Sequence, residues 1–278
     1  MVHPLAEPSE LRQVVVAAVV EVLDIGRDTA GEVAEEVYSQ VEAILEEIEQ
    51  DRLNSSDYCS FTFSSAGSHL IQGSGFLDPG ADVAVVKARR ARSAAPAWIE
   101  VLKVLEPRAF ECLGRGVLAL LGCTDATVTS TSRDQGIDFY GHLSLGTRLD
   151  NASVLPSIDS TMSVWLAGQA KHYPSGRVSS DEVRSIVGSV ALARAQVYAP
   201  GHQTLDGFRP RFSDPVFVLF FTTGDFTRDS LLLIDRSGVI PMNGVRLATF
   251  LSDNCIGIDD QGKFDRKLAE EWIASFEK

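Results

Sequence analysis

Residues 216–221 restrict the fold more than any other stretch, because they place six apolar side chains in a row, Val-Phe-Val-Leu-Phe-Phe. An uninterrupted apolar run is typical of a strand that is covered on both faces, as in sheets with helices packed on either side. The Thr and Asp residues that follow at 222–227 are suited to cap a further helix. The chain is therefore expected to contain a layered α/β domain.

Helical and strand patterns alternate around this run. A helix is predicted to begin near Pro107, a residue suited to a first helical turn, and another near Ser179, ahead of a stripe of Val and Ile. Strands are predicted at 127–131, in a short run that contains Asp138, and at 163–171. This order predicts an α/β fold in which a central mixed sheet is flanked by helices.

The first third of the chain has a different pattern. A helix capped by Ser9 is predicted to run to about residue 23, and a second helix from about residue 28 to residue 51. The first is apolar nearly all round and is expected to be buried, whereas the second carries Glu opposite its apolar stripe. Residues 54–82 are rich in Ser, Gly and Asp, which predicts a loop with at most one short hairpin.

Charge is unevenly distributed along the sequence. Residues 1–57 hold fourteen acidic and three basic side chains, a net charge of −11 out of −13 for the whole chain. A basic cluster follows, and it precedes a Ser/Ala/Pro hinge at 93–96: Lys87, Arg89, Arg90 and Arg92. Two interpretations stay open for this cluster, a solvated surface linker or a contact with a DNA backbone. The predicted domains are an acidic helical module at 1–95 and an α/β domain at 96–278.

Several classes of protein are disfavoured by the same composition. The four cysteines form no CxxC pair and have no His at zinc spacing, so neither a disulfide framework nor a structural zinc site is expected. The longest apolar run, at 14–20, is too short to cross a bilayer, and acidic residues precede it where a signal peptide carries positive charge. A cytoplasmic protein without a membrane partner is expected. The negative net charge argues against a general nucleic-acid binder.

Polar side chains at the end of the strand at 163–171 are the candidate functional site. Because strand side chains alternate between faces, Gln169 and Lys171 point the same way and Ala170 points the other way. Asp138 lies on the strand expected to be adjacent. An acid facing a Gln/Lys pair can hold a hard cation and a water beside a phosphodiester. Asp134 is the competing acid, and its place at a turn favours a structural role.

The motifs in this part of the chain resemble a known family. The similarity rests on Phe110-Glu111 within a helix, Leu120-Leu121-Gly122, Asp134-Gln135-Gly136-Ile137-Asp138 and Gln169-Ala170-Lys171. This pattern resembles the catalytic domain of Mrr-type restriction endonucleases, which belong to the PD-(D/E)XK nuclease superfamily. The resemblance covers about residues 100–257 and does not extend to the N-terminal third.

The resemblance implies a restriction-endonuclease-like core and a set of site residues. It implies that Asp138 binds a metal, that Gln169 replaces a second carboxylate, that Lys171 serves catalysis and that Glu111 also belongs to the site. Mg²⁺, for which Mn²⁺ can substitute, prefers oxygen ligands, and the main chain of Ala170 is a further candidate ligand. The spacing between Asp138 and Gln169 is long, so an insertion must loop out between the paired strands.

The sequence therefore predicts a Mg²⁺-dependent endonuclease that hydrolyses DNA, in restriction or another defence against foreign DNA. The N-terminal module would serve dimerisation, target recognition, regulation or attachment to a partner protein of a defence system. Two alternatives stay open: a non-catalytic interaction protein on a nuclease fold, and a ligand-activated or RNA-directed nuclease.

Overall fold

The computed structural model describes residues 4–54, 58–64, 67–76, 80, 82–129, 136–144, 163–197, 205 and 207–277. The chain divides into two compact units. The first comprises Met1–Pro96 with Ile258–Phe264, and the second comprises Ala97–Gly257 with Asp265–Lys278. Across the described ranges, no helix is both long and apolar enough to traverse a bilayer.

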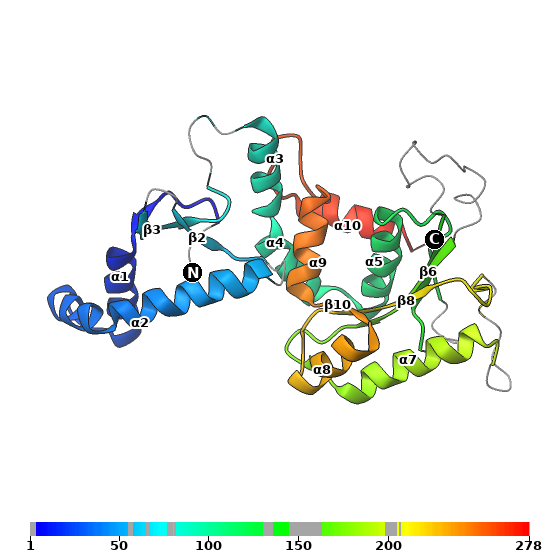
Figure 1. Ribbon diagram of the computed structural model, residues 1–278. Coiled ribbons are helices and arrows are strands. Elements are labelled where there is room, and N and C mark those ends of the chain that lie inside the picture. The colour runs from blue at the N-terminus through cyan, green and yellow to red at the C-terminus, as the bar shows by residue number, and fades with distance from the viewer. Residues whose placement is uncertain are drawn as a thin grey trace, which may run out of the picture. The chain divides into compact units, whose positions relative to one another are not determined.

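The first unit combines a helical hairpin with a small sheet (Figure 1). Its helices are α1 (Leu11–Leu23) and α2 (Arg27–Asn54), and its strands are β1 (Ser9–Glu10), β2 (Phe61–Ser64) and β3 (Gly67–Gly73). The strands are antiparallel in the order β1-β3-β2. Residues that the sequence assigned to a loop with one hairpin thus belong to a three-stranded sheet, which β1 completes from a distant part of the chain.

The expectation that the first helix is buried was wrong. In α1 only Leu11 and Val15 are buried, while Val22 is 79% exposed. Leu11 and Val15 pack with Ala34 of α2 and Ile71 of β3. A hairpin and one small sheet cover a single side of a helix, so its other apolar side chains stay at the surface of this unit.

The basic cluster lies on a helix rather than in a linker. Helix α3 (Val83–Arg92) begins at Asp82, whose side chain accepts a hydrogen bond from the Ala84 N–H. Arg89 donates to the carbonyl of Phe76 at 2.7 Å, which ties the helix to the end of the β2–β3 segment. Helix α4 (Ala95–Val104) follows after a short turn, where the sequence suggested a hinge.

The second unit is built on a five-stranded mixed sheet in the order β10-β8-β6-β5-β4. Its strands are β4 (Thr127–Val128), β5 (Phe139–Ser144), β6 (Ser163–Lys171), β8 (Val216–Thr222) and β10 (Ile240–Met242). β5 is antiparallel to β4 and β6, whereas β6, β8 and β10 run parallel. β7 (Arg177–Val178) and β9 (Asp225–Phe226) form a separate parallel pair.

Helices cover both faces of this sheet, as Figure 1 shows. They are α5 (Pro107–Leu120), α7 (Ser180–Arg194), α8 (Arg228–Ser237), α9 (Gly244–Asp253) and α10 (Arg266–Ala274). On one face, Phe139 of β5 lies against Phe221 of β8, with 4.9 Å between ring centroids, and against Gly114 of α5. On the other face, a core of apolar side chains joins the sheet to α7 and α8.

This architecture confirms the predicted fold class, a central mixed sheet flanked by helices with a helical N-terminal region. The apolar run at 216–221 lies inside β8, the second strand of the sheet, where Phe220 and Phe221 are fully buried on opposite faces. Burial on both faces is what favours an unbroken apolar sequence there.

Candidate active site at the ends of strands β5 and β6

Asp138 lies one residue before β5. It is held by hydrogen bonds to the two residues that flank Gln169 on β6. Its N–H donates to the carbonyl of Gly168 at 2.9 Å, and its Oδ2 accepts the N–H of Ala170 at 2.7 Å. The side chain is nearly buried, since only 3% of the residue is exposed. The sequence placed Asp138 within a strand; it precedes β5 and is held by contacts to the neighbouring strand β6.

Gln169 and Lys171 lie on the face of the sheet that α7 covers. The preceding residue, Gly168, faces Phe139 on the opposite side, and side chains alternate along the strand. Gln169 is 6% exposed, and its Nε2 lies 3.8 Å from the position that a Cβ at Gly136 would occupy. Lys171, the last residue of β6, is half-buried. The predicted alternation of Gln169, Ala170 and Lys171 is therefore present.

Gly136, two residues before Asp138, allows the backbone there to approach α7 closely. Its φ is +80°, a conformation that other residues rarely adopt, and a Cβ there would lie 2.6 Å from Oγ of Ser189 on α7. Only glycine fits both conditions. The turn thereby delivers Asp138 to the start of β5 with its backbone in register with β6.

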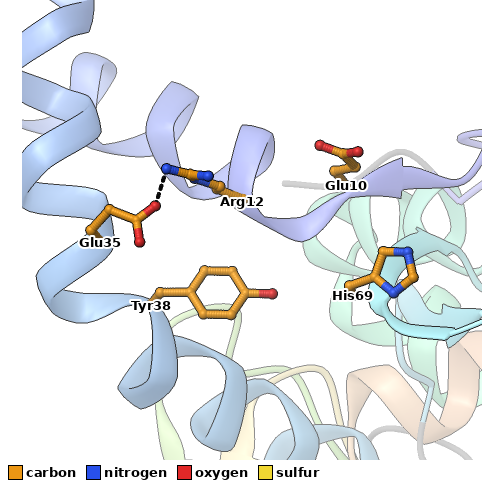
Figure 2. A pocket seen from close by; sticks show the side chains of 5 residues that line it. All are labelled: Glu10, Arg12, Glu35, Tyr38 and His69. Atoms are coloured by element: carbon orange, nitrogen blue, oxygen red, sulfur yellow. Dashed lines mark ion pairs between the residues drawn. The ribbon is translucent and has the colours of Figure 1, made fainter.

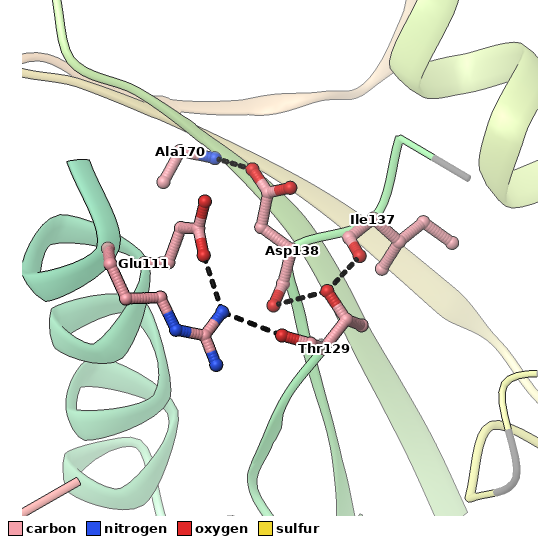
Figure 3. Close-up of polar contacts among 6 residues, drawn as sticks. Glu111, Thr129, Ile137, Asp138 and Ala170 are labelled. Carbon is pink, nitrogen blue, oxygen red and sulfur yellow. Dashed lines mark hydrogen bonds and ion pairs between the residues drawn. The ribbon is translucent and has the colours of Figure 1, made fainter. Parts of the chain in front are cut away.

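Glu111 comes from α5, on the opposite face of the sheet from α7. Its Oε2 accepts a hydrogen bond from Nη1 of Arg108 at 2.6 Å, and the same nitrogen donates to the carbonyl of Thr129 at 2.7 Å. The Oγ1 of Thr129 in turn donates to the carbonyls of Ile137 and Asp138 (Figure 3). A chain of polar contacts thus connects the helix carboxylate to Asp138.

A further carboxylate acts on Lys171 from α7. Glu182 accepts hydrogen bonds from the Ser179 N–H, the Ser179 hydroxyl and the Tyr173 hydroxyl, the last at 2.7 Å. Burial raises the pKa of Glu182, but these hydrogen bonds and the charge of Lys171 outweigh it, so the net pKa lies below its usual value. Glu182 is therefore an ionised carboxylate at neutral pH, on the face where Lys171 ends its strand.

The candidate donors are oxygen atoms, as a hard divalent cation requires. They come from both faces of the sheet, Glu111 from the α5 side and Gln169 from the α7 side. Asp138 and Glu111 offer carboxylates, Gln169 an amide oxygen and Ala170 a main-chain carbonyl. Among the described residues, no three His, Cys, Asp or Glu side chains are grouped closely enough to form a ready-made metal centre. The donor set fits Mg²⁺ in kind, and it is sparse in charge, since Gln169 is uncharged.

The sequence reasoning missed several members of the site. Arg108 and Thr129 connect Glu111 to Asp138, and Glu182 faces Lys171; of these, only Arg108 left a signal, since it precedes Glu111 by one helical turn. The competing acid Asp134 lies outside the described residues. So does most of the insertion expected at 143–162, whose first residues, Leu143 and Ser144, belong to β5. His142 and His172 flank this region and are half-buried: the ring centroid of His142 lies 5.2 Å from that of Trp165, and Nε2 of His172 lies 3.2 Å from the carbonyl of Leu102.

A separate pocket of about 270 Å³ lies in the first unit, between its helices and its sheet (Figure 2). It is lined by Glu10, Arg12, Glu35, Tyr38 and His69. An ion pair between Arg12 and Glu35 joins α1 to α2 at this pocket. Burial, together with Glu42 and Glu35, raises the pKa of Tyr38, so its hydroxyl stays protonated. None of the predicted site residues lines this pocket.

Comparison with known proteins identifies the domain that carries the site. Residues 102–199 match the family model of the Mrr catalytic domain, described as a restriction endonuclease. This segment contains Glu111, Asp138, Gln169 and Lys171. No curated protein matches the chain.

Two solved structures share a broad similarity with the chain. One is the MspJI restriction endonuclease in complex with a 27-mer oligonucleotide, at 21% identity and a TM-score of 0.43, covering 72% of this chain and 39% of that one. The other is the DNA modification-dependent restriction endonuclease AspBHI, at 19% identity and a TM-score of 0.42, covering 77% of this chain and 46% of that one. The chain thus spans less than half the length of either protein.

The family match covers about a third of the chain and leaves the first unit unassigned. It confirms the resemblance drawn from the helix, turn and strand motifs. The family to which residues 102–199 of this chain are similar is the Mrr catalytic domain of restriction endonucleases.

Proposed function

We propose that this chain is a Mg²⁺-dependent endonuclease that hydrolyses phosphodiester bonds of DNA in defence against foreign DNA. The observation that carries the proposal is the fixed carboxylate of Asp138, which accepts the N–H of Ala170 while Gln169 and Lys171 flank that residue on the same strand. The restriction endonuclease family of this segment supports DNA as the substrate and restriction as the setting.

Each site residue has a distinct proposed role. Asp138, Glu111, the amide oxygen of Gln169 and the carbonyl of Ala170 would hold the cation, and Mn²⁺ would substitute for Mg²⁺. When bound, such a cation polarises a phosphoryl oxygen and acidifies a water. Lys171 orients the attacking water and offsets negative charge that develops on the phosphate. Asp138, anchored through its own backbone, needs little reorganisation to do this work.

The acidic N-terminal module is proposed to control where the nuclease acts. We place it at residues 1–95 and the nuclease domain at 96–278. The negative charge of the N-terminal module repels DNA phosphates and so limits indiscriminate contact with DNA. Such a module suits a nuclease that is recruited by a partner protein, or by assembly into a dimer or higher oligomer, in the cytoplasm.

Cleavage of supercoiled plasmid DNA with Mg²⁺ or Mn²⁺ tests the proposal. We expect the wild type to nick and linearise the plasmid, and Asp138→Ala and Lys171→Ala each to lower the rate by at least about 100-fold, since both act on the reacting phosphate. Asp181→Asn and Lys103→Ala are matched controls, because both side chains lie at the surface in i,i+3 ion pairs. Circular dichroism and thermal melting check that every variant is folded.

The same assay separates the alternatives. Unchanged cleavage by Asp138→Ala and Lys171→Ala would place the chemistry elsewhere and overturn the proposal. Cleavage of RNA but not DNA by the wild type would establish the RNA-directed alternative. A folded wild type that cuts neither substrate, with or without added metal, would favour an interaction protein on a nuclease fold.

A further inference from the structure

Arg108 makes two short contacts that place it between the helix carboxylate and the sheet. Its Nη1 lies 2.6 Å from Oε2 of Glu111 and 2.7 Å from the carbonyl oxygen of Thr129. The Glu111 side chain is only 19% exposed, so the pair is partly shielded from water. Both contacts use the same nitrogen of a rigid, planar guanidinium, so Arg108 bridges the helix carboxylate and the backbone of the sheet.

Thr129 transmits this restraint to Asp138. Its N–H donates to the carbonyl of Asp138 at 2.8 Å, and its Oγ1 donates to the carbonyls of Ile137 at 2.9 Å and Asp138 at 3.2 Å. Thr129 is itself buried. One residue therefore receives Arg108 through its carbonyl and holds the backbone of Asp138 through its N–H and hydroxyl.

We propose that Arg108 is a positioning residue that holds Glu111 in place beside Asp138 for joint binding of a divalent cation. The proposal rests on the function proposed above. Arg108 occupies Oε2 of Glu111, and in Figure 3 the other carboxylate oxygen lies on the side of Ala170 and Asp138. Arg108 thus sets which oxygen of Glu111 is left for the cation.

The electrostatics of the site support this role. Two carboxylates that approach each other repel unless positive charge lies between or beside them. The guanidinium offsets the charge of Glu111 before a cation arrives, and its fixed geometry lowers the reorganisation needed when the cation binds. Loss of a partner that orients a metal ligand typically costs 10- to 100-fold in metal affinity or activity.

Mn²⁺ binding, followed by electron paramagnetic resonance, tests the proposal without requiring cleavage. We expect Arg108→Ala and Arg108→Gln to raise the half-saturating Mn²⁺ concentration by about 10- to 100-fold, and Arg108→Lys to recover part of the loss. In the Glu111→Ala background, Arg108→Ala should have little further effect, because the two residues act as a unit. Cleavage assays should show the same shift in Mg²⁺ requirement.

Arg115 provides a matched control on the same helix. It also donates to backbone carbonyls, those of Ala126 at 2.8 Å and Phe276 at 3.0 Å. Arg115→Ala therefore removes a helix arginine together with these two contacts, neither of which involves Glu111. We expect it to lower the melting temperature while leaving Mn²⁺ binding unchanged.

Two results would overturn the proposal. One is Mn²⁺ binding that is absent in the wild type or indifferent to Arg108 in folded variants. The other is a loss of Mn²⁺ affinity on Arg108→Ala that is equally large in the Glu111→Ala background and is accompanied by weaker DNA binding in Ca²⁺. That result would mean that Arg108 contacts the phosphate itself. A wild type that binds Mn²⁺ through Arg108 and Glu111 but never cuts nucleic acid would instead refute the proposed function and leave this inference intact.

Discussion

Three arginine ion pairs in the second unit have the same spacing in the sequence and different surroundings in the fold. Arg108–Glu111, Arg184–Asp181 and Arg211–Asp214 are all separated by three residues. The Asp181 side chain is 90% exposed, that of Glu111 19% and that of Asp214 6%. Exposed pairs contribute little to stability, whereas a shielded carboxylate depends on its partner. The sequence reveals the spacing but not the burial, which is why Arg108 was missed.

Asp214 gives a prediction at the residue scale. The side chain and N–H of Arg211 hydrogen-bond to Asp214, and together with Ser163 they lower its pKa from 3.8 to about 2 despite burial, which acts in the opposite direction. A lowered folded-state pKa adds stability above pH 4, and this contribution is lost as the pH falls from about 4 to about 2. We expect Asp214→Asn to lower the free energy of unfolding by about 1 to 2 kcal/mol at pH 7.

Denaturant unfolding measured from pH 7 down to pH 2 checks this prediction. The difference between Asp214→Asn and the wild type should shrink across the acidic window, and Asp181→Asn should show almost none at any pH. An equal destabilisation of Asp214→Asn at every pH would mean that packing rather than charge is responsible. Nuclease activity at neutral pH should be preserved in both folded variants.

At the scale of elements, sequence patterns were sufficient to predict helices and strands whose burial is set by neighbouring residues in the sequence. The strand expected at 163–171 is β6 (Ser163–Lys171), Pro107 begins α5, and the helix predicted after Ser179 begins at Ser180. Pairing between distant segments was not visible in the same way. β1 joins β3 across about sixty residues, and the sequence carries no local signal for a strand of two residues. The basic residues of α3 were likewise not assigned to a helix, and a surface linker and a DNA-backbone contact were both left open.

The N-terminus of α7 gives a prediction at this scale. Glu182 accepts the otherwise unpaired N–H of Ser179, at 2.8 Å, and the Tyr173 hydroxyl, at 2.7 Å. Both contacts end on one carboxylate, so Glu182→Ala removes a helix cap and a link to the segment after β6. We expect a loss of about 1 to 2 kcal/mol in unfolding free energy, with a smaller loss for Glu182→Gln, which keeps an acceptor.

Thermal and denaturant unfolding of the two variants, beside Tyr173→Phe, resolves the contributions. Tyr173→Phe removes one hydrogen bond and leaves the cap, so its loss should be smaller than that of Glu182→Ala. If Glu182→Ala is as stable as the wild type, the capping contact does not stabilise α7. Since α7 lies against the turn at Gly136 through Ser189, a frayed α7 should also slow cleavage.

At the scale of the whole molecule, the acidic residues and the candidate site residues are concentrated in different parts of the chain. The candidate site residues all lie within the matched segment at 102–199, while the first 57 residues carry a net charge of −11. Both features are visible in the sequence because neither depends on how segments pair in space. The role of the acidic module is not visible there, since charge alone does not say whether a surface repels DNA or attracts a basic partner.

The acidic face of α2 gives the last prediction. Four of its exposed glutamates, Glu32, Glu36, Glu46 and Glu47, can be changed together to Gln in the full chain. If this face repels DNA, the variant should bind nonspecific duplex DNA about 3- to 10-fold more tightly than the wild type in 50 mM salt, and the gap should close above about 0.3 M because salt screens exposed charges. Fluorescence anisotropy across a salt series measures this difference.

The matched control changes the same four residues to Asp, which keeps the charge and alters only side-chain length. Affinity close to that of the wild type in this control, beside tighter binding by the Gln variant, would assign the effect to charge. Equal affinities for all three proteins at every salt concentration would contradict repulsion of DNA by this face. The acidic surface would then be free to serve a basic partner, and cleavage would have to be restrained by a different part of the molecule.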